Sequence, residues 1–221
     1  MVGPIVVINP NSNKTITYEL GQALKNFRLV NGPEIECLTL AEGPFGIESQ
    51  LDSDSVILPL SKLVASRRDA SAFVIACYSD PGLDTCRSIT TKPVFGIQES
   101  GVLTAMARAD LFGVIAISEA SIRRHRRFMA RMNVLSRLAE ELAINISVNS
   151  SANAEDTYQR LVETGNRLKD KGAGAIVLGC AGMARHRSAL ESELGTVIID
   201  PTQAAVSMAI GSVLANDFHA N

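Results

Sequence analysis

Two of the four cysteines in this chain of 221 residues stand directly after an apolar run. Cys77 follows "AFVIA" (72–76), Cys180 follows "GAIVLG" (174–179), and each begins a turn that precedes an expected helix. The backbone N–H groups at a helix N-terminus favour negative charge, which lowers the pKa of a nearby thiol from its usual value of about 8.5. We therefore expect both cysteines to supply thiolate near neutral pH.

Two such thiols on opposite sides of a planar intermediate suit inversion of configuration at a carbon atom. One thiolate would remove a proton from one face, and the other thiol would return a proton to the opposite face, without a cofactor. Because the carbon is a weak acid, the site must also stabilise the enolate oxygen. Backbone donors in the turns "CYSDPG" (77–82) and "CAGM" (180–183) suit this task, and Gly179 and Gly182 would let a substrate approach the main chain.

A structural role is the alternative for every cysteine, since free cysteines are among the most buried residues of proteins. We interpret Cys37, in the middle of an expected strand, and Cys86, in an expected helix, in this way. Cys77 and Cys180 differ because each has a strand before it and a turn after it in its own half of the chain. This matched context favours a function for the pair.

Short β-branched runs alternate with longer segments of helical period along the chain. This alternation predicts an α/β fold with parallel sheets that are covered by helices on both faces. The expected strands cover 5–8, 35–40, 72–76, 93–97, 112–117, 143–148, 174–179 and 196–200. The expected helices cover 14–28, 53–68, 83–90, 99–110, 119–140, 154–171, 183–193 and 201–215.

Three motifs of the first half recur in the second half in the same order. "IVVINPN" resembles "GVIAISE", "IECLTL" resembles "AINISV", and "FVIACYSDPG" resembles "IVLGCAGM". The repetition predicts two similar lobes, each a parallel sheet flanked by helices, related by pseudo-two-fold symmetry with the active site between them. We assign residues 1–97 plus 201–221 to the N-terminal lobe and residues 98–200 to the C-terminal lobe, with the last helix able to pack on either.

Polar residues at the strand ends are the next candidates, because ligands of open α/β sheets bind beyond the carboxyl ends of the strands. Asn9, Cys77, Ser118 and Cys180 all stand at such ends, so the two-lobe hypothesis gathers them in one cleft. Asn9 could hold a substrate carbonyl or amide, or could form an Asx-turn. Ser118 could contact a substrate or could only cap the next helix.

The composition is typical of a soluble globular protein, with 46% hydrophobic and 20% charged residues. The net charge of −2 provides no basic field that would attract nucleic acid or anionic lipid. We interpret the densest basic cluster as a solvated helix face; it consists of Arg123, Arg124, Arg126 and Arg127.

The N-terminal segment "MVGPIVVINPNSN" lacks the features of a signal peptide, and no apolar run approaches the roughly 20 residues that span a membrane. We therefore expect a cytoplasmic protein with reduced thiols and no membrane partner. No CxxC pair occurs, and the three histidines lack the spacing of a zinc site, so we expect no metal.

Five motifs together resemble the hydantoin racemase branch of the aspartate/glutamate racemase superfamily. They are "INPNSN" (8–13), "GPFGIES" (43–49), "ACYSDPGLD" (76–84), "PVFGIQES" (93–100) and "VLGCAGM" (177–183), and "DP" (200–201) follows them. The resemblance implies two α/β lobes, a catalytic cysteine from each lobe, no cofactor, and a homo-oligomer. It also implies racemisation of 5-monosubstituted hydantoins or of allantoin, which is itself a substituted hydantoin.

This resemblance assigns the acid and base roles to Cys77 and Cys180. It implies substrate contacts from Asn9, Ile47, Tyr78, Ser79, Ser118, Ala181 and Gly182. Amino-acid racemases of the superfamily typically follow their cysteines with Asn-Thr and Thr-His, whereas Tyr78-Ser79 and Ala181-Gly182 follow them here. Because those donors for a free α-carboxylate are missing, the resemblance favours an uncharged cyclic amide over glutamate or aspartate. Arylmalonate decarboxylases keep only the second-lobe cysteine, so Cys77 argues against that activity.

The sequence leaves two other functions open. A cis–trans isomerase of an unsaturated diacid, similar to maleate isomerases, would add one cysteine covalently to the double bond, although the sequence offers no obvious carboxylate clamp. Two symmetric α/β lobes also suit a non-catalytic protein that binds a small molecule in a closing cleft.

Overall fold

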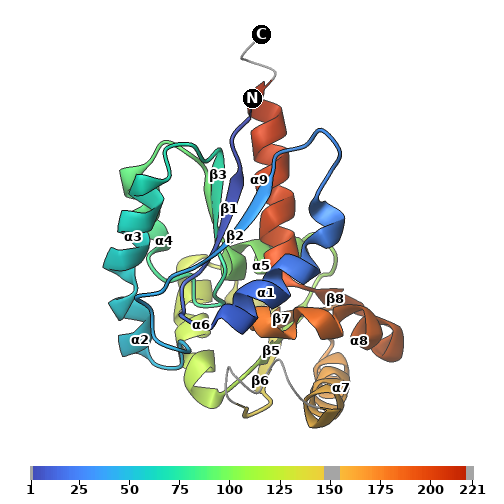
Figure 1. Cartoon of the computed structure of the whole chain (residues 1–221). Coiled ribbons are helices and arrows are strands. Elements are labelled where there is room, and N and C mark those ends of the chain that lie inside the picture. The colour runs from blue at the N-terminus through green and yellow to red at the C-terminus, as the bar shows by residue number, and fades with distance from the viewer. Residues whose placement is uncertain (1, 147–154, 218–221) are drawn as a thin grey trace.

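The computed structural model describes residues 2–146 and 155–217 (Figure 1). The first lobe is built on a parallel sheet of four strands in the order β2-β1-β3-β4. These strands are β1 Ile5–Asn9, β2 Ile35–Thr39, β3 Ala72–Ile75 and β4 Val94–Gly96. Every residue of β1 and β3 is buried, which is why their sequences are almost continuously apolar.

The second lobe repeats this topology with a parallel sheet in the order β6-β5-β7-β8. Its strands are β5 Phe112–Ala116, β6 Leu138–Ala143, β7 Ala175–Gly179 and β8 Val197–Ile199. The expected fold class, two similar lobes that each contain a parallel sheet flanked by helices, is confirmed.

The outer face of the first sheet is covered by helices that follow β2 and β3. They are α2 Gln50–Ser55, α3 Ile57–Ser66 and α4 Leu83–Ile89. Because side chains alternate along a strand, Val6 and Ile8 face this layer and pack with apolar side chains of α3 and α4.

The inner face of the same sheet looks toward the second lobe. Ile5 and Val7 point this way and join a central core with apolar residues of helix α1 Lys14–Ala23. A short 3₁₀-helix, η1 Lys25–Phe27, follows α1. The central core also contains residues of β5 and β7, so one apolar cluster holds the two lobes together.

The second lobe has its own outer helical layer. Helices α7 Glu155–Asp170 and α8 Arg187–Leu194 pack against the second sheet, as Figure 1 shows near the end of the chain that is coloured orange to red. Along the chain, α6 Glu119–Arg131 and the short η2 Leu135–Arg137 come after β5 and before β6, and η4 Ala181–His186 follows β7.

Two helices exchange between the lobes. Helix α5 Ile97–Met106 directly follows the last strand of the first sheet and contacts β5, β7 and β8 of the second sheet. Helix α9 Pro201–Asp217 follows the last strand of the second sheet and contacts β1, β3 and β4, so it runs beside the first sheet in Figure 1. We therefore propose the division in which residues 201–221 belong with residues 1–97, while α5 and residues up to 200 form the second lobe.

The prediction for strand β6 was wrong in position. The sequence predicted one helix over 119–140 and a strand over 143–148, whereas α6 ends at Arg131 and the strand covers Leu138–Ala143; residues 147 and 148 lie outside the described part. Asn133 ends the helical segment with a left-handed backbone (φ 59°), which asparagine tolerates better than most residues. The strand sequence "LAEELA" consists of good helix formers, so its propensity opposes its actual structure.

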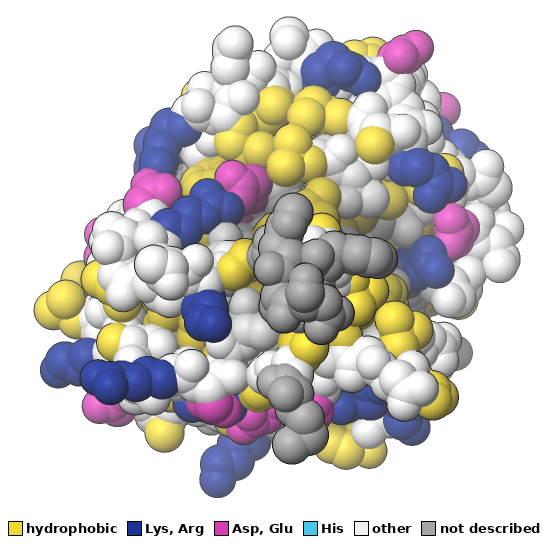
Figure 2. Space-filling model, turned by 90° about the horizontal axis from the view of Figure 1, so that it is seen from above, with side chains coloured by type: hydrophobic (Ala, Val, Ile, Leu, Met, Phe, Trp, Pro, Cys, Tyr) yellow, Lys and Arg dark blue, Asp and Glu magenta, His cyan; other side chains and the backbone are white. Residues whose placement is uncertain are grey.

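The surface carries charges of both signs without a large single-sign field on the face seen in Figure 2. Basic and acidic side chains are interspersed around this face, and a group of hydrophobic side chains lies in its upper part. None of the helices in the described residues is both long and apolar enough to cross a membrane.

Candidate active site

Each of the two cysteines begins a tight turn at the carboxyl edge of its sheet. Cys77 lies two residues after β3 and Cys180 lies directly after β7, and these strands hold equivalent positions in the two sheets. The carbonyl of Cys77 accepts a hydrogen bond from the N–H of Asp80 (3.0 Å), and the carbonyl of Cys180 accepts one from Met183 (3.1 Å). The two turns therefore have the same kind of backbone hydrogen bond, from an N–H group to the carbonyl three residues earlier.

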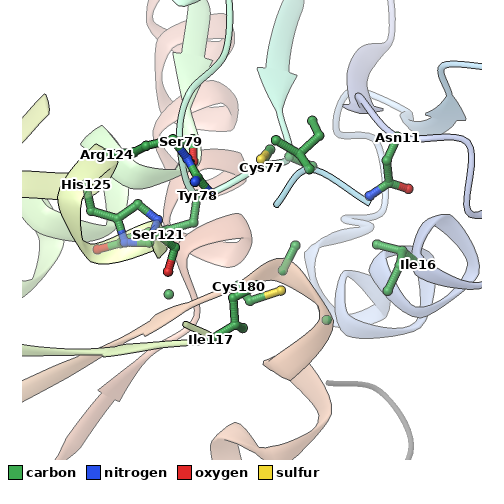
Figure 3. Close-up of a pocket in the computed structure, with 15 residues that line it drawn as sticks. Asn11, Ile16, Cys77, Tyr78, Ser79, Ile117, Ser121, Arg124, His125 and Cys180 are labelled. Atoms are coloured by element: carbon green, nitrogen blue, oxygen red, sulfur yellow. The ribbon is translucent and has the colours of Figure 1, made fainter. Parts of the chain in front are cut away.

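Both turns border a single pocket between the lobes. Figure 3 shows the side chains of Cys77 and Cys180 on opposite sides of this cavity. The pocket contains about 450 Å³ that no atoms fill, and part of this space is open to solvent. Seven of the nine expected site residues line it: Ile47, Cys77, Tyr78, Ser79, Cys180, Ala181 and Gly182.

Asn9 is not on the pocket wall, and Asn11 is there instead. Asn9 is fully buried, its Nδ2 lies 2.9 Å from Oδ1 of Asn11 and 3.1 Å from the carbonyl of Asn13, and its Oδ1 accepts the N–H of Asn11. Oδ1 of Asn11 also accepts the N–H of Asn13 (2.9 Å), so both of its described bonds use the oxygen. Figure 3 shows the Asn11 nitrogen turned toward the pocket, where it is a hydrogen-bond donor.

Ser118 is likewise replaced on the wall by a residue three positions later. Ser118 is the N-cap of α6: its hydroxyl oxygen accepts the N–H of Ser121, and the Ser121 hydroxyl returns a bond to the Ser118 carbonyl (2.7 Å). Ser121 is buried and lines the pocket. Of the two roles expected for Ser118, its geometry therefore fits the helix cap.

The thiol of Cys77 does not have the lowered pKa that the sequence suggested. Its side chain keeps some surface toward the pocket, but protein surrounds it, and this desolvation raises its pKa to about 12. A backbone N–H from Ser79 and the positive charge of Arg124 act in the opposite direction, and the proximity of Cys180 raises the pKa further. Helix α4 begins only at Leu83, too far along the chain for its first turn to compensate for burial.

The Cys77 turn is fixed to helix α5 through a buried carboxylate. The two oxygens of Asp80 accept the N–H groups of Gln98 (2.9 Å) and Glu99 (2.8 Å), which satisfies free donors at the helix start. A Cβ at Gly96 would lie 2.3 Å from this carboxylate, so only glycine fits there. Burial raises the pKa of Asp80 to about 7, and the two N–H donors partly offset the effect. Asp80 therefore belongs to the Cys77 turn and also caps helix α5.

Gly179 lines the pocket, as expected, and its lack of a side chain also has a structural cause. A Cβ at this position would meet the carbonyl of Ile115 at 2.6 Å and Cα of Ala116 at 3.2 Å. These atoms belong to the neighbouring strand β5, so the glycine permits the close approach of β5 and β7.

Helix α6 presents one polar face to the pocket, which the sequence did not predict. Ser121, Arg124 and His125 all line the cavity, and their spacing places them on one side of the helix. The interpretation of the arginine cluster as a solvated face was wrong for Arg124, which is only 9% exposed. Figure 3 shows its side chain reaching across to Ser79. In the sequence, only the i, i+3, i+4 spacing of Ser121, Arg124 and His125 indicates that they share one helix face.

Arg124 joins the two lobes at the pocket wall. Its Nη1 donates to the carbonyl of Glu48 (2.8 Å) in the first lobe, and its Nε lies 3.5 Å from Oγ of Ser79. Burial lowers its pKa, while the nearby Cys77 acts in the opposite direction.

A buried histidine–carboxylate pair lies behind the same wall. Nδ1 of His125 lies 2.6 Å from Oε1 of Glu141 on β6, and both side chains are almost completely buried. The imidazole also meets the ring of Tyr78 edge-on, at 4.9 Å between centroids. The carboxylate fixes the orientation of the ring.

The described residues contain no group of three or more His, Cys, Asp or Glu side chains arranged to hold a metal ion. The arrangement is instead one of two thiols, several hydrogen-bond donors and one buried cation around a mostly apolar cavity. Such a site can exchange protons with a neutral or weakly acidic organic molecule.

Comparison with known proteins gives consistent matches over nearly the whole chain. The family described as Asp/Glu/Hydantoin racemase matches residues 5–209. A hydantoin racemase of Paenarthrobacter aurescens is 32% identical over 93% of this chain and 89% of its own length. A second, from Pseudomonas sp. (strain NS671), is 33% identical over 93% of this chain and 84% of its own. The structure of an allantoin racemase from Klebsiella pneumoniae superposes with a TM-score of 0.91 at 30% identity, covering 98% of this chain and 89% of that one.

Proposed function

Because the chain belongs to the Asp/Glu/Hydantoin racemase family, we propose that it catalyses the cofactor-independent racemisation of 5-monosubstituted hydantoins, allantoin included. The observation that carries this proposal is the pair of cysteines, Cys77 and Cys180, that approach one pocket from topologically equivalent strand ends. A planar ring between them would expose one face to each sulfur.

The proposed reaction moves one proton at each sulfur. The thiolate of one cysteine takes the proton from C5, and the electron pair of the C–H bond moves into the adjacent carbonyl to form an enolate. The thiol of the other cysteine then gives its proton to the opposite face of C5, which restores the carbonyl and inverts the carbon. The two cysteines end with exchanged protonation states, and proton exchange with solvent resets them.

Stabilisation of the enolate is assigned to donors near the cysteines. The N–H groups of Ala181 and Gly182 open the 3₁₀-helix η4 ahead of Met183, whose N–H makes the first bond of the turn. Together with Nδ2 of Asn11 they can bind the ring oxygens. Ile47, Tyr78 and Ser79 complete the proposed contacts, whereas Asn9 and Ser118 act as positioning residues for Asn11 and Ser121.

We further propose a cytoplasmic homo-oligomer. Several large apolar side chains are strongly exposed on the isolated chain, among them Val30 (93%) and Leu51 (78%), and burial against a second copy would remove them from water. Light scattering coupled to size-exclusion chromatography tests the assembly.

The test of the function is a chiral assay with allantoin, 5-benzylhydantoin and 5-isopropylhydantoin against a reaction without enzyme. Wild-type protein should racemise at least one of them, and Cys77→Ala and Cys180→Ala should each lower kcat/KM by about 10²–10⁴-fold. Full activity in both variants would refute the two-base mechanism. Ligand binding that both variants retain, with no turnover in any protein, would identify a binding protein instead.

A further inference from the structure

A second hollow lies next to the reactive pocket and has a different electrostatic character. The two share Ser79 and Arg124 in their walls. Three arginines line the outer hollow, Arg124, Arg127 and Arg131, and no Asp or Glu is among its described lining residues. It contains about 540 Å³ of unfilled space, again with part of it open to solvent.

Arg124 brings a buried positive charge to the junction of the two hollows. Within the described residues its hydrogen bonds go to the carbonyls of Glu48 and Ala120 and to the hydroxyl of Ser79, and none of them goes to a carboxylate. Asp52 interacts electrostatically with Arg124, while one of its oxygens accepts the N–H groups of Glu48 and Ser49. Cys77, Asp52 and Glu48 act on this charge through space, but with no carboxylate among the described residues hydrogen-bonded to it Arg124 can still pair with an added anion.

Arg127 adds an exposed charge to the same hollow. Its described hydrogen bond is to the neutral side chain of Gln50 (2.7 Å). Arg131, by contrast, is paired with Asp84 and packs over the ring of Phe128. Among the described residues, Arg124 and Arg127 therefore make no hydrogen bond or close ion pair with a carboxylate.

We propose that the outer hollow is an anion subsite, in which Arg124 and Arg127 bind a carboxylate at the end of the C5 substituent while the hydantoin ring occupies the reactive pocket. The inference rests on the proposed racemase function and narrows its substrate class to hydantoins with an acidic side chain. The reacting ring remains uncharged, so the missing α-carboxylate donors beside the cysteines do not conflict with this charge.

The experiment compares two substrates that differ in charge but hardly in shape. These are 5-(2-carboxyethyl)hydantoin and its amide, 5-(2-carbamoylethyl)hydantoin, followed by polarimetry. Wild-type kcat/KM should favour the acid by about tenfold, as expected for charge-assisted hydrogen bonds, and added salt should reduce the preference.

Substitutions on one helix provide the matched controls. Arg127→Gln should lower the acid-to-amide ratio by about fivefold, the upper value for an exposed charge pair. Arg126→Gln should leave the ratio unchanged, because Arg126 pairs with Glu140 outside the hollow. Arg124→Lys, which keeps the charge, should retain part of the preference.

The outcomes separate the subsite from the racemase function. A wild-type ratio near one, or a ratio that Arg127→Gln does not change, would overturn the subsite. Absence of racemisation for the acid, the amide and 5-benzylhydantoin alike would overturn the proposed function. In that case calorimetric binding of the acid and the amide to the wild-type protein still decides the subsite, since the same preference is expected in Kd.

Discussion

The two cysteine turns are alike in their backbone and different in what holds them. Both follow equivalent strands, and in both the cysteine carbonyl accepts the N–H of the residue three positions later. That residue is Asp80 in the first turn, which is bound to the start of α5, but Met183 in the second, which is fully buried among apolar side chains. The first turn is fixed by hydrogen bonds and the second by packing.

The difference extends to the helices that exchange between the lobes. Helix α5 is capped by the carboxylate of Asp80 from the first cysteine turn, whereas α9 is capped by Asp200 at the end of its own strand, which accepts the N–H of Gln203 (2.7 Å). Symmetry is therefore retained where a racemase needs two equivalent faces. It is lost where helix α5 must be attached to the Cys77 turn, and this gives the two thiols unequal surroundings.

The largest expected effect comes from removing one thiol at a time. In D₂O, Cys180→Ala should exchange C5 hydrogen of one enantiomer without inverting it, because Cys77 removes and returns the proton on a single face. Cys77→Ala should do the same with the opposite enantiomer, and each should lose about 10²–10⁴-fold in racemisation. NMR of separated enantiomers measures both rates, and their ratio reports how unequal the thiols are.

Cys37→Ala is the matched control for this experiment, since Cys37 is a partly buried thiol on β2 outside the reactive pocket. Its racemisation should match that of the wild type. Exchange of both enantiomers by a single-cysteine variant would contradict the assignment of one face to each sulfur.

The pH dependence tests the unequal surroundings directly. The active form carries one thiolate and one thiol, so kcat/KM should rise by about tenfold per pH unit below the first ionisation of the pair and fall above the second. Burial raises the pKa of Cys77 to about 12, so we expect no falling limb up to about pH 10. Because the equilibrium constant of racemisation is one, both enantiomers must give the same profile. A falling limb near neutral pH would show that the second thiol ionises readily.

Substituting the capping residues Asp80 and Asp200 should distinguish a cap that also anchors the Cys77 turn from one that only caps its helix. Asp80→Ala leaves two buried N–H groups without acceptors and should lower the free energy of unfolding by about 3 kcal/mol. It should also reduce kcat, since the Cys77 turn loses its anchor. Asp200→Ala removes one N-cap and should cost about 1 kcal/mol with kcat/KM almost unchanged. Denaturant titration and steady-state kinetics check both variants; equal effects on activity would remove the distinction between the caps.

The sequence was sufficient for the parts of the molecule that depend on local pattern. Continuous apolar strands and the paired cysteine motifs predicted two lobes and a shared pocket. The pattern failed at β6, because "LAEELA" favours a helix and becomes a strand only by pairing with β5.

The remaining errors concern side-chain direction and burial. The choice between Asn9 and Asn11 depends on the loop after Pro10, whose geometry no periodicity reports. The pKa of Cys77 and the inward position of Arg124 arise where α6 of one lobe meets the other lobe, so they are properties of the assembled fold.

The smallest expected effect compares the two loops that support the pocket wall. In the first lobe Asn9 holds Asn11, and in the second Ser118 holds Ser121. Asn11→Asp keeps the oxygen that accepts the N–H of Asn13 but replaces the donor that faces the pocket, so kcat/KM should fall by about tenfold, the effect of one hydrogen bond. Ser118→Ala removes only a cap and should cost about 1 kcal/mol of stability with little loss of activity. If Asn11→Asp instead lost stability and kept its kcat/KM, Asn11 would be a loop anchor like Asn9, and the first lobe would contribute no side-chain donor from this loop.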